Sequence, residues 1–354
     1  ETVLAGLLML ATTATGVLLA CGLSLRQFTD ALSRALEATL VLSFLLELYV
    51  ALILREPLIP IYMKDWKEVP PSYIWVEGNI FKGGPIQGIV GNRNPLAFIA
   101  LLTLICVAVR WRDNRLRLPN FIVWSALSVL TLFLTGSATV IVAAVVSLVV
   151  MLFLWLLRHV PIALRTTVIV VASTLGVGLV AVAIGWHSQL TALLGRSSDM
   201  TGRWEIWMKV LALWEQHTFL GWGWIMYWVP WIPMFGTLVI RPDGTPTLSA
   251  HNAYIEALFQ TGVVGAALIV VLVLTLTFRS FRLAVHYLDS DASVLLPALL
   301  MTAMVVQSMT ESRLLSEGNW VTVCALGTWL GLHKNMERER DDPWALEESI
   351  SRRR

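Results

Sequence analysis

Long apolar runs dominate this sequence and restrict the chain to folds that suit a lipid bilayer. A spanning helix needs about 20 mostly apolar residues, and backbone groups inside a bilayer must satisfy their own hydrogen bonds. Nine candidate runs lie at 3–23, 36–54, 95–109, 121–134, 138–157, 166–185, 253–278, 292–309 and 319–332. The sequence therefore predicts an all-α, polytopic integral membrane protein with about nine transmembrane helices.

The composition agrees with this prediction and excludes several other classes of protein. Apolar residues make up 56% of the 354 residues and charged residues 14%, against about 45–50% and about 25% in soluble domains. The net charge of +2 is too small to indicate a protein that binds nucleic acid through phosphate contacts. Cys21, Cys106 and Cys324 lie in apolar runs without a CxxC or Cys/His spacing, so neither a disulfide scaffold nor structural zinc is predicted.

The distribution of basic residues predicts the orientation in the membrane. One set of connections, together with the C-terminal tail, carries 16 of the 26 Lys and Arg residues, and the longer opposite set carries 10. Because Lys and Arg are enriched on the cytoplasmic side, we expect loops 55–94 and 186–252 to lie outside. Glu1 then also lies outside, which leads us to expect an odd number of helices before it.

This topology divides the chain into four parts. We expect transmembrane helices with an outer loop at 55–94 within 1–185, a large extracytoplasmic loop at 186–252, further transmembrane helices at 253–332 and a cytoplasmic tail at 333–354. The first loop is rich in Pro and Gly, which indicates an irregular structure. The second contains eight of the sixteen tryptophans. They suit an aromatic belt at the lipid headgroups or a platform for lipid or sugar, so we expect function in these loops.

A surface helix with an arginine at its start is predicted within the second loop. Residues 202–217 form an amphipathic pattern, with Asp199 or Thr201 as the N-cap. Arg203 stands at the N-terminus, where the helix dipole disfavours a cation. This placement indicates an anionic partner for Arg203, and an ion pair with Glu205 or Asp199 is the alternative.

A His-Asn pair precedes the helix that follows this loop. In the segment SAHNAYIEALFQTGVVG, residues 249–265, Tyr254 and Glu256 fall in the first turns of the helix. Amide groups and the dipole at such a terminus attract phosphate and favour a neutral imidazole, which can accept a proton. These properties suit a transfer reaction, while a capping or interfacial role for His251 is the alternative.

The same segment resembles the signature of the O-antigen ligase superfamily, which joins lipopolysaccharide ligases, O-antigen polymerases and protein O-oligosaccharyltransferases. The resembling positions are His251, Asn252, Tyr254, Glu256, Gly262 and Gly265; Gly202, Arg203 and Trp204 through His217, Gly221 and Gly223; and Gly88, Gly91, Asn92, Asn94, Leu96 and Ala97. The resemblance covers about residues 80 to 332. It implies a GT-C-like membrane fold, usually of twelve spans, so three helices would precede Glu1.

The resemblance also implies an activity. A glycan would move from a polyprenyl (undecaprenyl) diphosphate to a hydroxyl acceptor on the periplasmic face of the bacterial inner membrane, as in lipopolysaccharide and cell-envelope biosynthesis. The transfer would invert the anomeric centre and need no metal and no cofactor. Members often carry a Ser-Arg pair where this chain reads Thr135-Gly136-Ser137-Ala138, so one phosphate-binding arginine is absent here.

These considerations give candidate site residues and leave alternatives open. His251 is the candidate general base, and Arg203 is the first candidate for the diphosphate, ahead of Arg93 and Arg313, which are alternatives for the missing arginine. The other candidate substrate-binding residues are Asn94, Asn252, Tyr254 and Glu256. The acceptor, whether lipid, glycan or protein, and the choice between ligase and polymerase stay open. A transporter would need ionisable groups within its spans, which here hold few charges beyond Glu47.

Overall fold

The computed structural model describes residues 1–66, 68–185, 202–241, 243–289 and 292–341, and the described residues are mostly helical. The helices are α1 (Thr2–Gly22), α2 (Leu25–Tyr49), α3 (Arg93–Arg112), α4 (Leu118–Thr135), α5 (Ala138–Leu157), α6 (Ile162–Gly185), α8 (Arg203–Trp214), α9 (Pro233–Gly236), α10 (Ala253–His286), α11 (Leu296–Ser308) and α12 (Glu317–Asp341). Within these residues β-structure is limited to isolated bridges. The predicted all-α class is confirmed.

Each of the nine predicted spans falls on a helix. Six of the described helices are long and apolar enough to cross a membrane: α1, α2 with its π-helical extension Val50–Leu54, α3, α4, α5 and α10. Shorter apolar helical stretches cover 162–176 and 292–308, and α12 contains the predicted run 319–332. The chain is therefore a polytopic helical membrane protein.

Several helices are longer than the apolar pattern predicted, and α2 and α10 show why. Helix α2 begins at Leu25, eleven residues before the predicted start, behind a capping box in which Ser24 and Gln27 bond each other's backbone amides. Helix α10 continues to His286, beyond the predicted end at 278. The added turns carry charged residues such as Asp30 and Arg282. A search for apolar runs ends at such residues, whereas a helix can continue through them.

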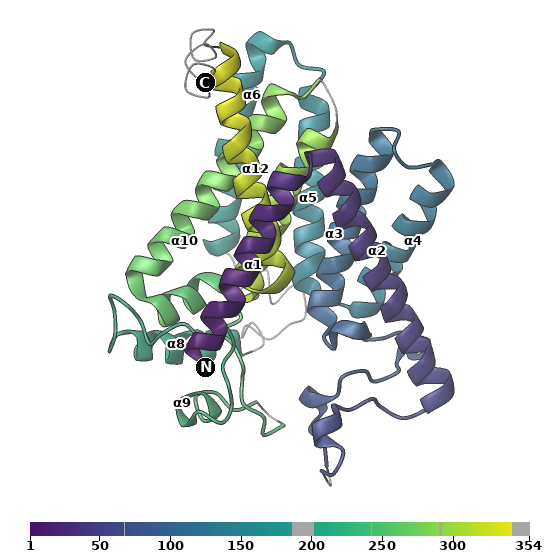
Figure 1. Cartoon of the computed structure of the whole chain (residues 1–354), viewed down its shortest axis with the longest axis vertical. Coiled ribbons are helices and arrows are strands. Elements are labelled where there is room, and N and C mark those ends of the chain that lie inside the picture. The colour runs from purple at the N-terminus through teal and green to yellow at the C-terminus, as the bar shows by residue number, and fades with distance from the viewer. Residues whose placement is uncertain (67, 186–201, 242, 290–291, 342–354) are drawn as a thin grey trace, which may run out of the picture.

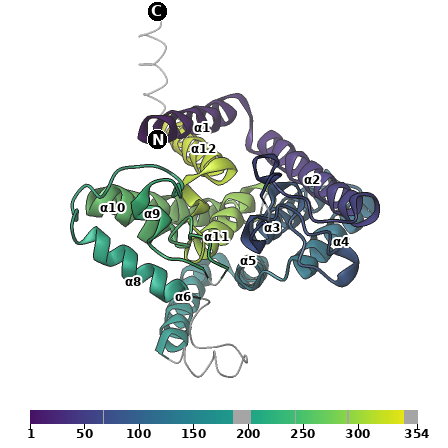
Figure 2. The same ribbon diagram turned by 90° about the horizontal axis from the view of Figure 1, so that it is seen from below.

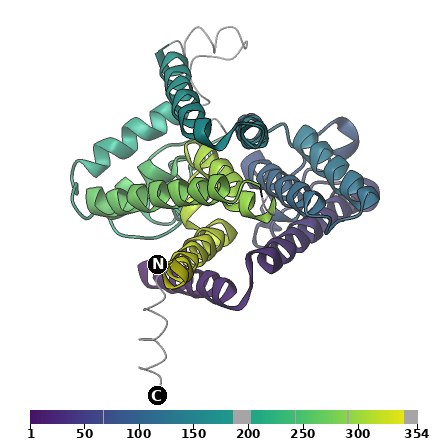
Figure 3. The same ribbon diagram turned by 90° about the horizontal axis from the view of Figure 1, so that it is seen from above.

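The helices run between two ends of the molecule, which carry different loops and connections. The described parts of both predicted outer loops, including α8 and α9, lie at the lower end in Figure 1, while the basic connection 113–117 lies at the opposite end. These described parts are therefore on one side of the molecule. Helix α1 packs along α12 at the edge of the bundle (Figures 2 and 3).

The centre of the bundle is formed by α3 and α11. Of the residues in the most apolar stretch of α3, 72% are buried. Helix α11 is buried over most of its length against α3, α5 and α10. The outer ends of these two helices therefore lie in the interior of the bundle rather than at its lipid-facing edge. Residues at those ends are well placed to build a site that the surrounding helices shield.

A kink in α10 positions the large outer loop. Gly262 has φ 65° and ψ −171°, a backbone conformation that residues with a Cβ rarely adopt. An added Cβ would also lie 2.1 Å from the Phe219 carbonyl oxygen. The kink releases the carbonyls of Phe259 and Gln260, which accept the amides of Trp222 and Gly223 at 3.0 and 2.9 Å. Gly262 therefore fixes the loop to the first turns of α10.

Candidate functional site

One buried carboxylate joins three of the predicted site residues at the end of the bundle where the predicted outer loops lie. Glu311 Oε1 accepts the side-chain amide of Asn94 at 2.8 Å and lies 3.2 Å from Arg203 Nη2. The second oxygen, Oε2, lies 3.4 Å from His251 Nδ1. Glu311 is 7% exposed. The structure thus brings together Asn94, Arg203 and His251, which are far apart in the sequence.

Five separate segments of the chain build this arrangement. Asn94 lies in the first turn of α3, Arg203 begins α8, His251 precedes α10 and Glu311 follows α11. Ser137, in the turn between α4 and α5, donates its hydroxyl to Asn94 Oδ1 at 2.9 Å. We refer to Asn94, Ser137, Arg203, His251 and Glu311 as the Glu311 cluster.

Asn252 holds His251 beside Glu311. Its Oδ1 accepts the amides of Tyr254 and Ile255, which makes it the N-cap of α10. Its own amide donates to Ser312 Oγ at 3.1 Å, and its side-chain Nδ2 donates to the Met309 carbonyl at 3.0 Å. Asn252 therefore ties the segment around Glu311 to the start of α10.

This cap bears on two expectations from the sequence. The α10 amides of Tyr254 and Ile255 already have Asn252 as their acceptor, whereas the helix start suggested that they are open to a phosphate. Asn252 itself is 9% exposed, and its contact with substrate stays a prediction. Tyr254 links α10 to α11, because its hydroxyl accepts from Ser308 at 3.0 Å.

Glu256 also lies away from the Glu311 cluster. It is 2% exposed, and its carboxylate accepts from Trp228 Nε1 at 2.6 Å, the Ala250 amide at 2.7 Å and Gln260 Nε2 at 2.7 Å. These bonds fasten the outer loop to α10. The buried carboxylate thus has three protein donors, and a contact of Glu256 with substrate stays a prediction.

Helix α8 delivers Arg203 to the cluster. The helix buries Ile206 and Val210 and packs on α10, and Trp207 Nε1 donates to the Ala250 carbonyl at 2.9 Å. The predicted helix at 202–217 is thus observed at 203–214, packed on the protein. Glu205, one of the two alternative partners, pairs with Lys209 at 2.8 Å. The other alternative partner and both predicted N-caps lie outside the described residues.

The other two candidate arginines occupy different surroundings. Arg93, the first residue of α3, is exposed at the same end of the molecule and next to Asn94 in sequence. Arg313 pairs with Glu317 at 2.8 Å and lines a pocket to which no residue of the Glu311 cluster contributes. Of the two, Arg93 is therefore the better second ligand for an anion bound at Arg203.

The electrostatics of the cluster keep Glu311 ionised. Burial raises the pKa of Glu311, but the hydrogen bond and charge of His251, then the charge of Arg203 and the bond from Asn94, outweigh it and hold the pKa below 4.5. Burial also lowers the pKa of Arg203, although Glu311 opposes that change. The side chains of Arg203 and His251 are 12% and 26% exposed, so both reach the surface.

The geometry assigns complementary tasks to the two nitrogens of His251. When Nδ1 carries a proton and donates to Glu311, Nε2 retains its lone pair and can accept a proton. The carboxylate also stabilises the imidazolium that would form, as the acid does in hydrolytic triads. Arg203 meanwhile has more N–H groups than Glu311 can accept. The cluster therefore combines a base with donors for an anion.

Glu311 was not singled out by the sequence, where it was one of several outer carboxylates. Its one local signal is the polar run Gln307–Arg313 between two apolar stretches. The described residues hold no group of three or more His, Cys, Asp and Glu that would suit a metal ion. Metal-independent chemistry stays a prediction.

Comparison with known families gives a match to a region that contains part of the Glu311 cluster. Residues 121–270 match the family model described as O-Antigen ligase, a stretch that runs from α4 into α10 and includes Arg203 and His251. A comparison with curated proteins found no match. The match agrees with the polytopic helical fold and with the resemblance of the sequence motifs. The chain is therefore a multi-pass helical membrane protein whose residues 121–270 are similar to the O-antigen ligase family.

Proposed function

We propose that this protein transfers a glycan from a polyprenyl (undecaprenyl) diphosphate to a hydroxyl acceptor at the periplasmic face of the bacterial inner membrane. The observation that carries the proposal is the convergence of Arg203 and His251 on Glu311. A base and a guanidinium group held by one carboxylate suit a reaction that activates a hydroxyl and releases an anionic leaving group. The family match supports the same class of enzyme.

The transfer can be written as a single displacement. The acceptor oxygen attacks the anomeric carbon and forms the new glycosidic bond, while His251 Nε2 takes the proton from the acceptor hydroxyl. The bond between the anomeric carbon and the diphosphate oxygen breaks, and its electron pair leaves with the diphosphate. Attack opposite the leaving group inverts the anomeric centre, and no second carboxylate nucleophile is needed.

Arg203 is placed to stabilise the leaving diphosphate. A guanidinium presents five N–H donors in a planar fork that matches phosphate oxygens, and here Nη2 contacts Glu311. Arg93, exposed at the start of α3, supplies a second guanidinium at the same end of the bundle. Arg203 and Arg93 together carry two positive charges at this end of the bundle, against the single carboxylate of Glu311.

Transfer by the purified chain in lipid nanodiscs tests the proposal directly. The reaction contains a polyprenyl-diphosphate glycan and a sugar-bearing acceptor, with EDTA present, and products are resolved by size. We expect EDTA-resistant transfer, with a single addition for a ligase and a ladder for a polymerase. Transfer that appears only after Mg²⁺ or Mn²⁺ is added would contradict the metal-independent scheme.

The periplasmic placement of the site is tested by labelling in intact cells. Single cysteines at Lys82, which is exposed in the first outer loop, and at Asn114, in the opposite connection, are treated with a membrane-impermeant thiol reagent. We expect labelling at position 82 and none at 114 until the cells are permeabilised. Labelling at 114 alone would reverse the orientation.

A further inference from the structure

Glu47 is a buried acidic residue of α2 that lies outside the Glu311 cluster. It belongs to the candidate span Leu25–Leu54 and is 0% exposed. An ionisable side chain is costly to bury within a membrane span, and one that is present generally serves a function of the protein. The groups that contact Glu47 therefore indicate its role.

Glu47 holds backbone amides of the first outer loop. Its Oε1 accepts the amides of Gln87 and Gly88 at 2.7 and 2.9 Å. Ser43 lies one turn earlier on the same face of α2, and its hydroxyl oxygen accepts the Ile89 amide at 3.3 Å. The second oxygen of Glu47, Oε2, is buried and has no hydrogen-bond partner among the described residues. Glu47 thus uses one oxygen to hold the loop, and Ser43 supports it.

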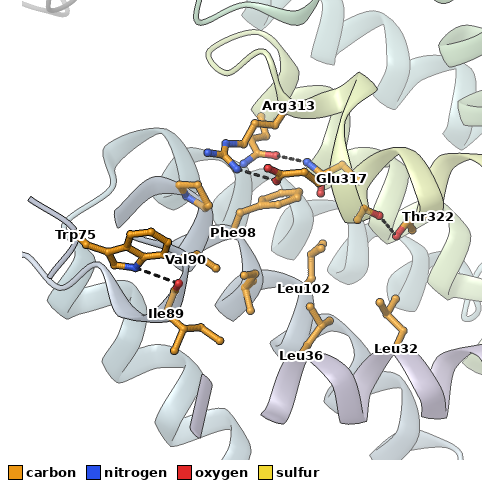
Figure 4. A pocket seen from close by; sticks show the side chains of 15 residues that line it. Leu32, Leu36, Trp75, Ile89, Val90, Phe98, Leu102, Arg313, Glu317 and Thr322 are labelled. Carbon is orange, nitrogen blue, oxygen red and sulfur yellow. Dashed lines mark hydrogen bonds and ion pairs between the residues drawn. The ribbon is translucent and has the colours of Figure 1, made fainter. Parts of the chain in front are cut away.

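The loop segment that α2 holds, residues 86–89, is fixed on two other sides. Trp75 donates its indole N–H to the Ile89 carbonyl at 3.2 Å, beside a pocket of about 440 Å³ that both residues line (Figure 4). The Ile86 amide donates to the Leu134 carbonyl, near the end of α4, at 3.2 Å. Segment 86–89 therefore lies between α2, Trp75 and α4 and is bonded to each of them.

Segment 86–89 leads directly into the first turn of α3. Asn94 follows Ile89 by five residues, and Asn92 caps α3 by accepting the Asn94 amide at 3.0 Å. The side chain of Asn94 then donates to Glu311 Oε1 at 2.8 Å. The position of the segment against α2 therefore affects where Asn94 stands in the Glu311 cluster.

The contact with α4 leads to the same asparagine. Leu134 precedes Ser137 by three residues, and Ser137 donates its hydroxyl to Asn94 Oδ1 at 2.9 Å. A shift of segment 86–89 away from α2 would therefore disturb Asn94 by two routes, one along the chain and one through the turn between α4 and α5.

We propose that Glu47 is a positioning residue for the transfer: by holding two amides of segment 86–89, it fixes Asn94 against Glu311. This role rests on the proposed function, because Glu311 in turn orients the imidazole and the guanidinium group of the cluster. A carboxylate is not needed for it, since one acceptor oxygen of Glu47 makes both bonds. An amide of the same length can therefore replace Glu47, whereas a shorter apolar side chain cannot.

Rates of transfer by variants of the full chain in nanodiscs test this role. Glu47→Ala should lower kcat by about 10- to 100-fold, since a misplacement of about 1 Å in a catalytic arrangement can cost about 100-fold. Glu47→Gln should keep most of the activity. Leu40→Ala is the matched control, because Leu40 is also 0% exposed on α2 and packs in the same apolar cluster as Ile86. Its cavity should lower stability but leave kcat per folded molecule unchanged. Equal losses of kcat in Glu47→Ala and Leu40→Ala, or in Glu47→Ala and Glu47→Gln, would overturn the role.

A double-mutant cycle tests whether Glu47 acts through Asn94. The kcat values of Glu47→Ala, Asn94→Ala and the double variant are compared with that of wild type. Residues that act as a unit are not additive, so the double variant should be no slower than Asn94→Ala alone. Losses that multiply in the double variant would show that Glu47 does not act through Asn94 and would overturn the assignment.

Hydrogen exchange separates failure of this role from failure of the proposed function. The amides of residues 87–89 should exchange faster in Glu47→Ala than in wild type or Leu40→Ala, whether or not glycan is transferred. If they do while wild type transfers no glycan, the proposed function is wrong and the hold of Glu47 on the loop stands. If wild type transfers glycan but exchange at these amides is the same in all three proteins, the role of Glu47 is wrong. Circular dichroism and gel filtration establish that the variants are folded.

Discussion

Two networks of buried charge lie at opposite ends of this molecule and differ in their balance of donors and acceptors. The Glu311 cluster lies at the outer end, and a second network joins the start of α2 to the end of α3 and the segment before α11. The second network, which we call the Arg110 network, comprises Asp30, Ser33, Glu37, Arg110, Asp113, Arg115 and Ser293.

Acceptors are plentiful in the Arg110 network. Arg110 is 7% exposed, and its guanidinium contacts Glu37 at 2.8 Å, Ser33 at 2.9 Å and Asp30 at 2.9 Å. Arg115 contacts Asp30 at 2.9 Å and Asp113 at 3.2 Å. Two guanidinium groups therefore share three carboxylates, and the network joins α2 to the end of α3 and the segment that follows it.

Donors are in excess in the Glu311 cluster. One carboxylate serves a guanidinium, an imidazole and an amide, and both Arg203 and His251 are partly exposed. A buried polar network that is matched within the protein holds structure, whereas one that is rich in donors at the surface can bind an anion. The difference distinguishes a structural network from a candidate site, and the following variants test it in order of their effect on transfer.

The largest effect is expected from removing the imidazole. His251→Ala should lower kcat by about 10²- to 10⁴-fold, the usual contribution of general acid–base catalysis, and His251→Gln should fail as well because an amide cannot take the proton. His217→Ala is the matched control, since His217 is an exposed outer histidine packed on Trp222. Initial rates with saturating donor measure both. Wild-type turnover by His251→Gln would exclude the role as base.

The next effect concerns the guanidinium of Arg203. Arg203→Ala should lower kcat/KM by about 10²- to 10³-fold, as for loss of one donor to a developing anion. Arg203→Lys should recover little because it loses the planar fork. Lys209→Ala, on the exposed side of α8 and paired with Glu205, is the control. Steady-state kinetics with varied donor provide the measurement, and normal turnover in Arg203→Ala would end the assignment.

A smaller effect is expected from Glu311→Gln, because Glu311 acts through its neighbours. The amide keeps the shape but loses the charge that orients His251 and Arg203, and we expect a loss of about 10- to 100-fold, by analogy with residues that orient metal ligands. Glu311→Asp should recover part of the activity. Glu205→Gln is the exposed control. If Glu311→Gln matched wild type at every pH, the carboxylate would not be a positioning residue.

The lowered pKa of Glu311 gives this variant a second readout. A carboxyl group whose pKa falls on folding stabilises the folded protein above its ordinary value near 4.5, and the contribution is lost as pH falls through the folded pKa below 4.5. Wild type should therefore lose more thermal stability than Glu311→Gln as the pH falls below 4.5. Unfolding temperatures of both proteins in nanodiscs from pH 3 to 7 measure this difference. An equal fall in the unfolding temperature of wild type and Glu311→Gln would contradict the ion pairs of Glu311.

The smallest effect on transfer is expected from the Arg110 network, although its effect on stability is large. Arg110→Met leaves Glu37 and Asp30 without this partner, and breaking a buried pair in this way costs about 3–5 kcal/mol. We expect a lower unfolding temperature but an unchanged kcat per folded molecule. Arg112→Met, exposed on the same helix, is the control. A selective loss of kcat would show that the inner network also serves the reaction.

The sequence by itself determined the helices and three members of the Glu311 cluster. Apolar runs are a local property, so the apolar parts of α3 and α10 follow from nearby residues. Arg203 and His251 were recognised because each stands beside a predicted helix start, and Asn94 because its motif resembles that of the O-antigen ligase superfamily. The early start of α2 was missed because its charges pair with α3, which no local pattern shows.

Only the tertiary structure decided how the polar residues are partnered. Glu311 meets His251, Arg203 and Asn94 across 60, 108 and 217 residues, and nothing in its immediate sequence indicates those contacts. Packing likewise gave Glu256 and Asn252 their protein partners and placed Arg313 at the edge of a separate pocket. Helix formation depends on neighbours along the chain, whereas the charge state and exposure of a side chain depend on which distant segments pack around it.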